Sequence, residues 1–142
     1  MRTLFVLALF AGALVVPAAP AKELHSIASG TEGIVAVPFA ATNEGRQRIA
    51  CTASIAHWYS LDLGEAGHGE AVEATLWFDP KSGEISILNA VGDRMPITAL
   101  WCGLAGKSWT TRSPVALPRR AGEMPGRIEL TCVRRRERLA CQ

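Results

Sequence analysis

The chain has 142 residues, with 15 lysines and arginines against 13 aspartates and glutamates, and a formal net charge of only +2. This length suits one domain around one hydrophobic core and leaves too little chain for two. Neither the composition nor any motif specifies a reaction, a cofactor or a ligand. Expectations about the fold and the binding surfaces therefore come from the predicted elements.

The first residues have the pattern of a secretory signal. Arg2 supplies the positive charge, Leu4 to Val16 form a short apolar run, and Pro17 to Ala21 end in small residues that a signal peptidase prefers. As a helix this run spans about 20 Å, which is short of the roughly 30 Å hydrocarbon thickness of a bilayer. A retained anchor is the alternative, but the flanking prolines and alanines suit cleavage better. We expect an exported protein, periplasmic or secreted, with no transmembrane segment after cleavage.

The expected organisation follows from this leader. It comprises a cleaved signal peptide (1–21), a flexible N-terminal arm (22–33) that is polar and glycine-containing, and a single β domain (34–142). Beyond Ile34, short apolar runs alternate with turn residues at the spacing of an all-β domain, and no apolar stripe of helical period is sustained. We therefore predict a small antiparallel β-sandwich or half-open barrel of about seven strands.

The expected strands can be placed in chain order. Arg48 to Ser60 alternates as one long strand, and Val72 to Phe78 forms a β-hairpin with Ile85 to Ile87 around the turn from Asp79 to Gly83. The remaining expected strands are Ile97 to Cys102, Trp109 to Arg112, Arg127 to Arg134 and Leu139 to Gln142. Prolines make the stretch from Ser113 to Gly126 a poor strand interior, so we expect a long surface loop there.

All the cysteines lie after the predicted signal, at Cys51, Cys102, Cys132 and Cys141. An even number in an exported chain predicts two disulfides, which would stabilise the domain. A metal site is the alternative, but it needs C-x-x-C pairs or nearby histidines, and neither is present, so no metal or cofactor is expected. Four cysteines allow three pairings; a turn at Arg136–Glu137 would bring Cys132 opposite Cys141 and leave Cys51 to pair with Cys102.

Two tryptophans are candidate binding residues. By the alternation above, Trp58 and Trp77 fall on the faces that otherwise carry polar side chains. An exposed indole offers a large rigid platform for sugar rings or for a protein partner. The alternative is that both faces of the sheet are covered and that these tryptophans belong to the core.

Four arginines at a predicted hairpin tip form the second candidate surface: Arg134, Arg135, Arg136 and Arg138. Arginine forks match the geometry of phosphate and carboxylate groups, which an exported protein meets in membrane and cell-wall polymers. The alternative is a solvated turn whose charges keep an edge strand from aggregating. Nucleic acid is not expected as a partner, because the basic segment has no interleaved stacking aromatics.

Charge is divided along the chain. Residues 61–93 are rich in acids, whereas eight arginines face only three glutamates from Arg112 onward. This division either steers anionic partners to one face or joins two halves that neutralise each other in the fold.

These observations favour a non-enzymatic accessory or protein-interaction module, of the assembly-factor or inhibitor type, with an envelope protein as partner. The alternative is a binding module for a polysaccharide or another anionic envelope polymer. A small hydrolase built around His57, with Ser60 and Asp62 close in sequence, is less favoured because no nucleophile-elbow or zinc-protease motif is present.

Overall fold

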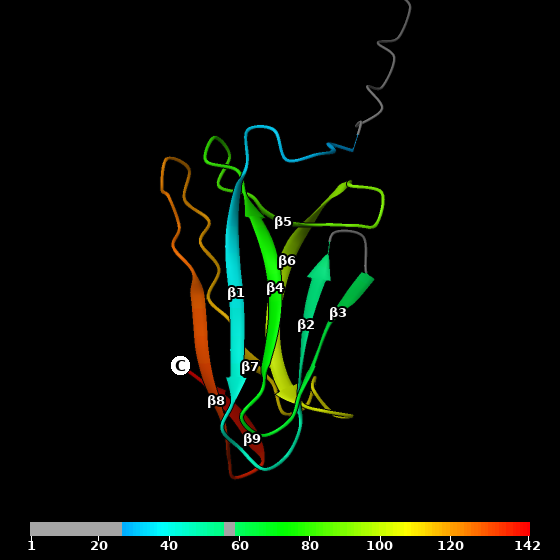
Figure 1. Ribbon diagram of the computed structural model, residues 1–142, viewed down its shortest axis with the longest axis vertical. Coiled ribbons are helices and arrows are strands. Elements are labelled where there is room, and N and C mark those ends of the chain that lie inside the picture. Colours follow the sequence, from blue (N-terminus) through cyan, green and yellow to red (C-terminus); the bar gives the residue numbers. More distant parts are fainter. Residues whose placement is uncertain (1–26, 56–58) are drawn as a thin grey trace, which may run out of the picture.

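The computed structural model describes residues 27–55 and 59–142, and this part of the chain contains strands and turns but no helix. The predicted all-β class is confirmed, with nine strands rather than about seven (Figure 1). They are β1 (Val35–Asn43), β2 (Ile49–Ile55), β3 (Tyr59–Ala66), β4 (Ala71–Phe78), β5 (Ile85–Leu88), β6 (Arg94–Leu104), β7 (Ser113–Pro114), β8 (Ile128–Arg135) and β9 (Arg138–Cys141). Within the described residues, no helix is long and apolar enough to cross a membrane.

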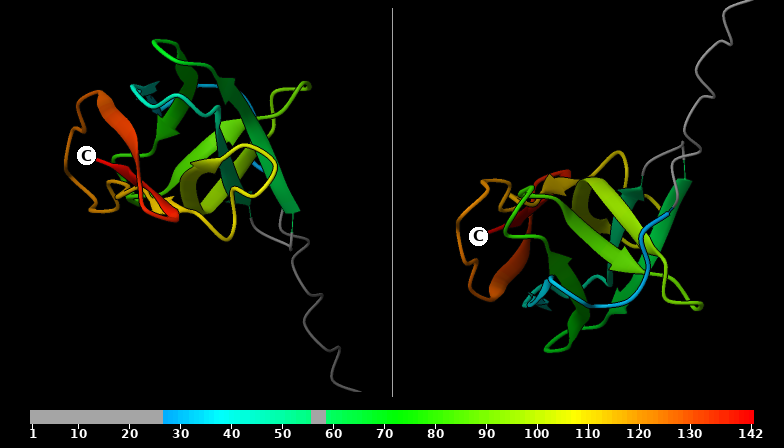
Figure 2. Two further views of the ribbon diagram at one scale, coloured as in Figure 1. Left: turned by 90° about the horizontal axis from the view of Figure 1, so that it is seen from below. Right: turned by 90° about the horizontal axis from the view of Figure 1, so that it is seen from above.

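The strands form one open sheet in the order β3-β2-β6-β5-β4-β1-β8-β9, with β7 added beside β6. All pairs are antiparallel except β1 with β8, which begins at Phe39 opposite Ile128. Seen end-on, the sheet curls around a common interior (Figure 2). The β9 end meets the segment before β7, where the Leu139 N–H donates to the Thr111 carbonyl at 2.8 Å.

The core follows from alternation along the strands. In β1 the buried apolar side chains are Val37, Phe39 and Ala41, and the paired strand β4 contributes Val72, Leu76 and Phe78. Successive residues of a strand point to opposite faces, so one face of the curled sheet fills the interior and the other is left for solvent or ligands.

The predicted disulfide pairing is the one that the structure contains. Cys51 and Cys102 are register partners on β2 and β6, and Cys132 and Cys141 are register partners on β8 and β9. The sulfur atoms of Cys102, Cys132 and Cys141 lie within 4.8 Å of one another. The bridge between β2 and β6 and the bridge within the C-terminal hairpin are therefore neighbours in space.

The prediction of one long strand from Arg48 to Ser60 is wrong. Strand β2 ends at Ile55 and β3 begins at Tyr59, and the two run antiparallel with Ile55 opposite Tyr59. As register partners, Ile55 and Tyr59 point to the same face, and an even number of residues separates them in the sequence. The period-2 pattern of β2 therefore continues in phase into β3, and it gives no sign that the chain has changed direction.

The strand predicted from Trp109 to Arg112 is also wrong, because these residues belong to a turn that folds back over β6. The Thr111 hydroxyl accepts from the Leu104 N–H at 2.8 Å and lies 2.9 Å from the Lys107 carbonyl, to which it donates. These bonds satisfy backbone groups where β6 ends, which an extended strand would leave to another partner.

Strand β1 has no counterpart among the strands expected from the sequence. It contains Pro38, which cannot donate a ladder hydrogen bond. Pairing with β8 begins only at Phe39, so Pro38 forfeits no ladder bond to β8.

The predicted β-hairpin between β4 and β5 is confirmed. The Gly83 N–H donates to the Asp79 carbonyl, and Gly83 has a φ of 76°, the left-handed conformation expected for this turn. The Arg119 carbonyl lies so close to Gly83 that an added Cβ would clash with it at 2.4 Å. The turn thus also docks the long loop that follows β7.

That loop, predicted from Ser113 to Gly126, begins with the two-residue strand β7 and then covers part of the core. Val115 is buried and its N–H donates to the Leu100 carbonyl. The Arg119 guanidinium donates to the carbonyls of Ile97 and Thr98 at 3.0 Å each, where β6 has a register irregularity. Arg119 therefore supports the sheet.

The predicted N-terminal arm is described from Ile27 onward. Ser29 forms an isolated bridge with Asp93, and the Arg94 guanidinium donates to the carbonyls of Gly30 and Glu32. Residues 27–33 are thus hydrogen-bonded across the β5–β6 turn.

Candidate functional site

A groove of about 540 Å³ crosses the outer face of β2 and β6. Its position follows from alternation, since Cys51 and Ala53 of β2 face the core while Thr52 and Ser54 face outward. Its lining consists of small or hydroxyl-bearing side chains and two tryptophans: Thr52, Ser54, Ser60, Ala99, Trp101, Ser108 and Trp109. The small side chains form the floor of the groove, and the two indoles border it.

The two tryptophans of the groove pack against each other edge to face, with ring centroids 5.2 Å apart. Trp101 is 7% exposed, whereas Trp109 is 59% exposed. Gly103 makes this arrangement possible, because a Cβ at this position would lie 2.2 Å from the Ser108 carbonyl oxygen. The turn carrying Trp109 can therefore lie directly on β6 and place its indole over the outer face of the sheet.

An arginine extends the tryptophan pair. The Arg112 guanidinium carbon lies 3.9 Å from the centroid of the Trp109 ring, and its Nη1 donates to the Trp109 carbonyl at 2.7 Å. The Arg138 Nη2 in turn donates to the Arg112 carbonyl at 3.3 Å. A cation over an indole face is favourable and holds both groups in place. The groove is thereby connected to the C-terminal hairpin.

The four predicted arginines do come together, at the turn between β8 and β9 near the lower end of Figure 1. Arg134 is the most engaged, since its side chain donates to the Arg136 carbonyl and to the Gln47 side chain. Arg136 occupies the turn with a φ of 55°. All four are exposed, and Arg138 alone reaches toward the groove.

Trp77 lies apart from this groove. It is half-buried on β4, on the face opposite its buried neighbours Leu76 and Phe78, and its register partners are Ala36 and Ser86. Trp58 and His57, the other predicted tryptophan and the proposed hydrolase base, lie outside the described residues. A role for Trp58 therefore stays a prediction.

A second groove of about 640 Å³ lies on the outer face of β1, β4 and β8. An ion pair between Arg127 and Glu129, at 2.9 Å, stands on its β8 side, and Glu73 lines it from β4. Arg127 and Glu129 are paired with each other, and no tryptophan lines this groove. It offers less to a ligand than the groove beside Trp109.

The cysteine sulfur atoms, Asp79 and His68 do not line the groove. The three clustered sulfur atoms of Cys102, Cys132 and Cys141 all belong to disulfides, so they present no thiolates to a metal. The pKa of Asp79 is lowered, first by the hydrogen bond from the Lys81 backbone, but Asp79 lies in the β4–β5 turn and not in the groove. The His68 Nδ1 is 3.2 Å from the Gly45 carbonyl and takes no part in the groove.

Trp109 and Arg112 were not singled out from the sequence as binding residues. The sequence predicts a strand over Trp109 to Arg112, and this prediction conceals that both residues lie on a surface turn. The available signal was the turn-forming stretch from Gly106 to Ser108 directly before a tryptophan, which places a large side chain on a surface turn.

Comparison with known proteins finds no matching family model, no matching curated protein and no matching solved structure.

Proposed function

We propose that this protein is an exported, non-enzymatic interaction module that binds a protein partner through the groove between β2, β6 and Trp109. The single observation that carries the proposal is the half-open tryptophan pair, with Trp109 exposed between Arg112 and the groove. Tryptophan and arginine are the residue types most enriched where protein interfaces concentrate their binding energy.

The geometry supports a defined kind of partner. Trp101 backs Trp109 from the sheet, so the exposed indole has a buried, rigid neighbour. The small floor residues leave room for one bulky apolar side chain from the partner. Arg112 and Arg138 lie beside that space, so an acidic group next to the apolar side chain would complement the site.

The two disulfides are typical of an oxidising, exported environment. The leader predicted over residues 1–21 supports export to the periplasm or beyond the cell. An envelope protein or a secreted protein is therefore the proposed partner, and the assembly-factor or inhibitor role belongs to the same proposal.

A second candidate function is recognition of a polysaccharide or another anionic envelope polymer. It is favoured by the four hydroxyl side chains that line the same groove as the indoles: Thr52, Ser54, Ser60 and Ser108. Hydroxyl groups and an aromatic ring suit a sugar, and the arginine turn between β8 and β9 would attract its charges.

The proposal is tested by capturing partners from a cell-envelope extract with the native protein, with Trp109→Ala and with Trp77→Ala. Both variants remove an indole from an outward-facing position, so Trp77→Ala is the matched control. We expect Trp109→Ala to lose a retained protein and Trp77→Ala to keep it. Circular dichroism and thermal unfolding establish that both variants are folded.

Other results would redirect the assignment. Loss of the partner only in Trp77→Ala would move the site to β4, as the sequence suggested, and retention by both variants would contradict an indole-centred site. If polysaccharide is enriched instead of protein, and replacement of the arginines at the β8–β9 turn abolishes this at low salt, the second function is supported.

A further inference from the structure

The two ends of the sheet differ in how they are covered. At the β9 end, the Leu139 N–H donates to the Thr111 carbonyl, and the Cys141 N–H donates to the Ser113 hydroxyl at 3.0 Å. At the other end, β3 pairs with β2 alone among the strands that the structure describes. Within the described chain, no backbone hydrogen bond joins the outer edge of residues 59–63 to another segment. The first half of β3 is therefore a free edge.

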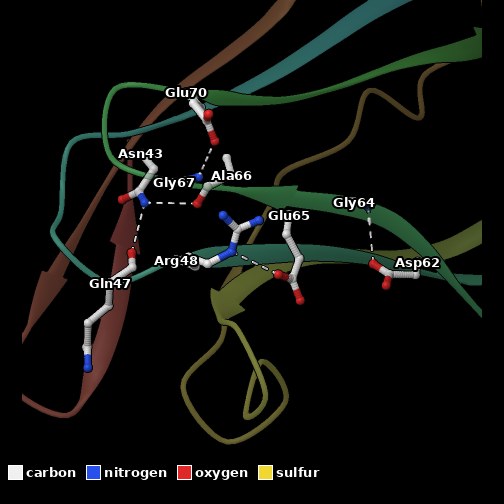
Figure 3. A network of polar contacts seen from close by, with 9 residues as sticks. All are labelled: Asn43, Gln47, Arg48, Asp62, Gly64, Glu65, Ala66, Gly67 and Glu70. Carbon is white, nitrogen blue, oxygen red and sulfur yellow. Dashed lines mark hydrogen bonds and ion pairs between the residues drawn. The ribbon is translucent and has the colours of Figure 1, made fainter.

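The second half of β3 is held close to β4 by a polar network at the turns (Figure 3). The buried Asn43 side chain donates to the carbonyls of Gln47 and Ala66, and the Glu70 carboxylate accepts from the Gly67 N–H at 2.7 Å. At Gly64, β3 still lies beside β4, since an added Cβ would contact Val72 at 3.9 Å. Residues 59–63 precede this contact, and there β3 diverges from β4 (Figure 1).

The free edge exposes two large side chains, Tyr59 and Leu61. Tyr59 and Leu61 lie opposite Ile55 and Ala53 of β2, so they belong to the inner face, yet they are 68% and 37% exposed. Ser60 and Asp62 alternate with them on the outer face. The interior layer thus continues to the last strand and ends there unpaired, which is the condition under which a sheet edge accepts another strand.

We propose that this edge pairs with the same edge of a second copy of the chain, antiparallel about a two-fold axis through Leu61. In this register Leu61 faces its own symmetry mate, Tyr59 faces Leu63 of the second copy, and Ser60 faces Asp62 of the second copy. Apolar residues meet apolar residues on the inner face, and a hydroxyl meets a carboxylate on the outer face. No like charges stand opposite each other.

The local backbone limits and defines this pairing. Between Asp62 and Gly64, one β3 residue has no partner on β2, and the Gly64 N–H is taken by the Asp62 carboxylate at 3.2 Å. The irregularity confines the flat edge to residues 59–63. A two-fold pairing of equal edges uses both edges up, so it gives a closed dimer and no fibre. Five paired residues make a small contact, so we expect association in the micromolar range or weaker.

The dimer has one consequence that rests on the proposed function. A two-fold axis perpendicular to the sheet keeps both outer faces on the same side, so the two tryptophan grooves would face the same direction. Ser60 lies in β3 and lines the groove, which places each groove next to the dimer seam. Two sites in one orientation can engage a repeating or dimeric partner with avidity.

The test uses the full chain, produced by export with its own leader, in analytical ultracentrifugation over a concentration series up to about 1 mM. We expect reversible dimers, and Leu61→Lys should weaken association by about tenfold, because two lysines would face each other across the axis. Dimerisation is measured without the partner, so its failure is distinguishable from failure of the binding proposal. A chain that is monomeric throughout overturns the inference.

The register is tested by cysteine substitution and mild oxidation, read on a non-reducing gel. Leu61→Cys places two thiols opposite each other, with Cβ atoms about 5 Å apart, and should form a covalent dimer. Tyr59→Cys is the matched control, because its thiols would lie roughly 13 Å apart along the strands and should not link. Equal linking of both variants, or dimers that Leu61→Lys leaves unchanged, would place the contact elsewhere and overturn the proposed pairing.

Discussion

Because Gly103 has no Cβ, the turn that carries Trp109 can pack directly against β6. A methyl group here would lie 2.2 Å from the carbonyl oxygen and 2.5 Å from the Cα of Ser108, and neither backbone atom can move without lifting the turn off β6. We expect Gly103→Ala to lower the free energy of unfolding by about 1–3 kcal/mol. Urea unfolding measures this, and a shift in tryptophan fluorescence should accompany it because the Trp101–Trp109 contact would open.

Gly126→Ala is the control for this substitution. A methyl group added at Gly126 would have no neighbouring atom within 4 Å, and Gly126 does not have a positive φ. Its replacement should leave stability within about 0.5 kcal/mol of the native value. If both variants unfold at the same urea concentration as the native protein, the turn does not pack on β6 as described.

Asp79 gives the β4–β5 turn a dependence on pH. The Lys81 backbone N–H donates to its carboxylate at 2.8 Å, and this bond lowers the pKa of Asp79 more than burial raises it, with smaller lowering effects from Ser82 and the Lys81 charge. A lowered folded-state pKa contributes stability above the unfolded pKa of about 3.9, and this contribution is lost as pH falls through the folded-state pKa.

The corresponding variant is Asp79→Asn, whose amide oxygen can still accept the backbone hydrogen bond but does not titrate in this range. We expect the native protein to lose stability relative to Asp79→Asn on acidification, by at most about 0.5 kcal/mol, because solvent screens this surface turn. Thermal unfolding at a series of pH values measures the difference. A stability difference that grows on going from acid to neutral pH in favour of Asp79→Asn would contradict the lowered pKa.

At the level of the strands, local sequence patterns predicted those features that depend only on residues close together in the sequence. The hairpin between β4 and β5 was predictable because alternation on both sides meets a turn containing Pro80 and Gly83. The cysteine pairing was predictable because the turn at Arg136–Glu137 lies midway between Cys132 and Cys141.

The predictions that were wrong or missing concern features that depend on contacts between residues distant in sequence. The parallel pairing of β1 with β8 joins residues almost ninety positions apart, as in the pair of Phe39 with Ile128, and no local period reports it. The site residues Trp109 and Arg112 escaped for the same reason. Their turn is stabilised by Thr111 reaching back to Leu104 and by Arg138 reaching across from β9, which the sequence around Trp109 does not reveal.

The two disulfides should differ in what they contribute. Cys51 and Cys102 are 51 positions apart, whereas Cys132 and Cys141 are 9 apart, so the first restricts the unfolded chain more. In the chain-entropy model, replacing Cys51 and Cys102 together by alanine costs about 4 kcal/mol, and replacing Cys132 and Cys141 costs about 3 kcal/mol. Urea unfolding of the two double variants measures this order; the reverse order would show that native packing outweighs chain entropy.

At the scale of the whole molecule, the acidic middle and the basic end do not neutralise each other through direct pairs. Among the ion pairs of the described residues, Arg120–Glu123, Arg127–Glu129 and Arg134–Glu137 lie wholly within the basic end, and Arg48–Glu65 alone involves the acidic middle. The arginine turn between β8 and β9 thus keeps a surplus of positive charge, and it lies at the same end of the molecule as the Trp109 turn (Figure 1).

This separation predicts different kinetic roles for the two surfaces once a partner is captured. The double variant Arg135→Glu, Arg136→Glu should slow association by about tenfold at low salt, because exposed charges act mainly on diffusional encounter. The difference should disappear as salt shortens the screening length. Trp109→Ala should instead speed dissociation, since packed contacts act after encounter.

Surface plasmon resonance over a range of salt concentrations measures both effects, with Lys81→Glu, Arg120→Glu as the charge-matched control. Lys81 lies in the β4–β5 turn, and the loop carrying Arg120 is hydrogen-bonded to that turn through Gly122 and Pro80, at the opposite end of the molecule from the arginine turn (Figure 1). If the control slows association as much as the arginine-turn variant, net charge attracts the partner and the arginine turn has no directing role. If the control associates at the native rate, the arginine turn between β8 and β9 guides the partner to the groove beside Trp109.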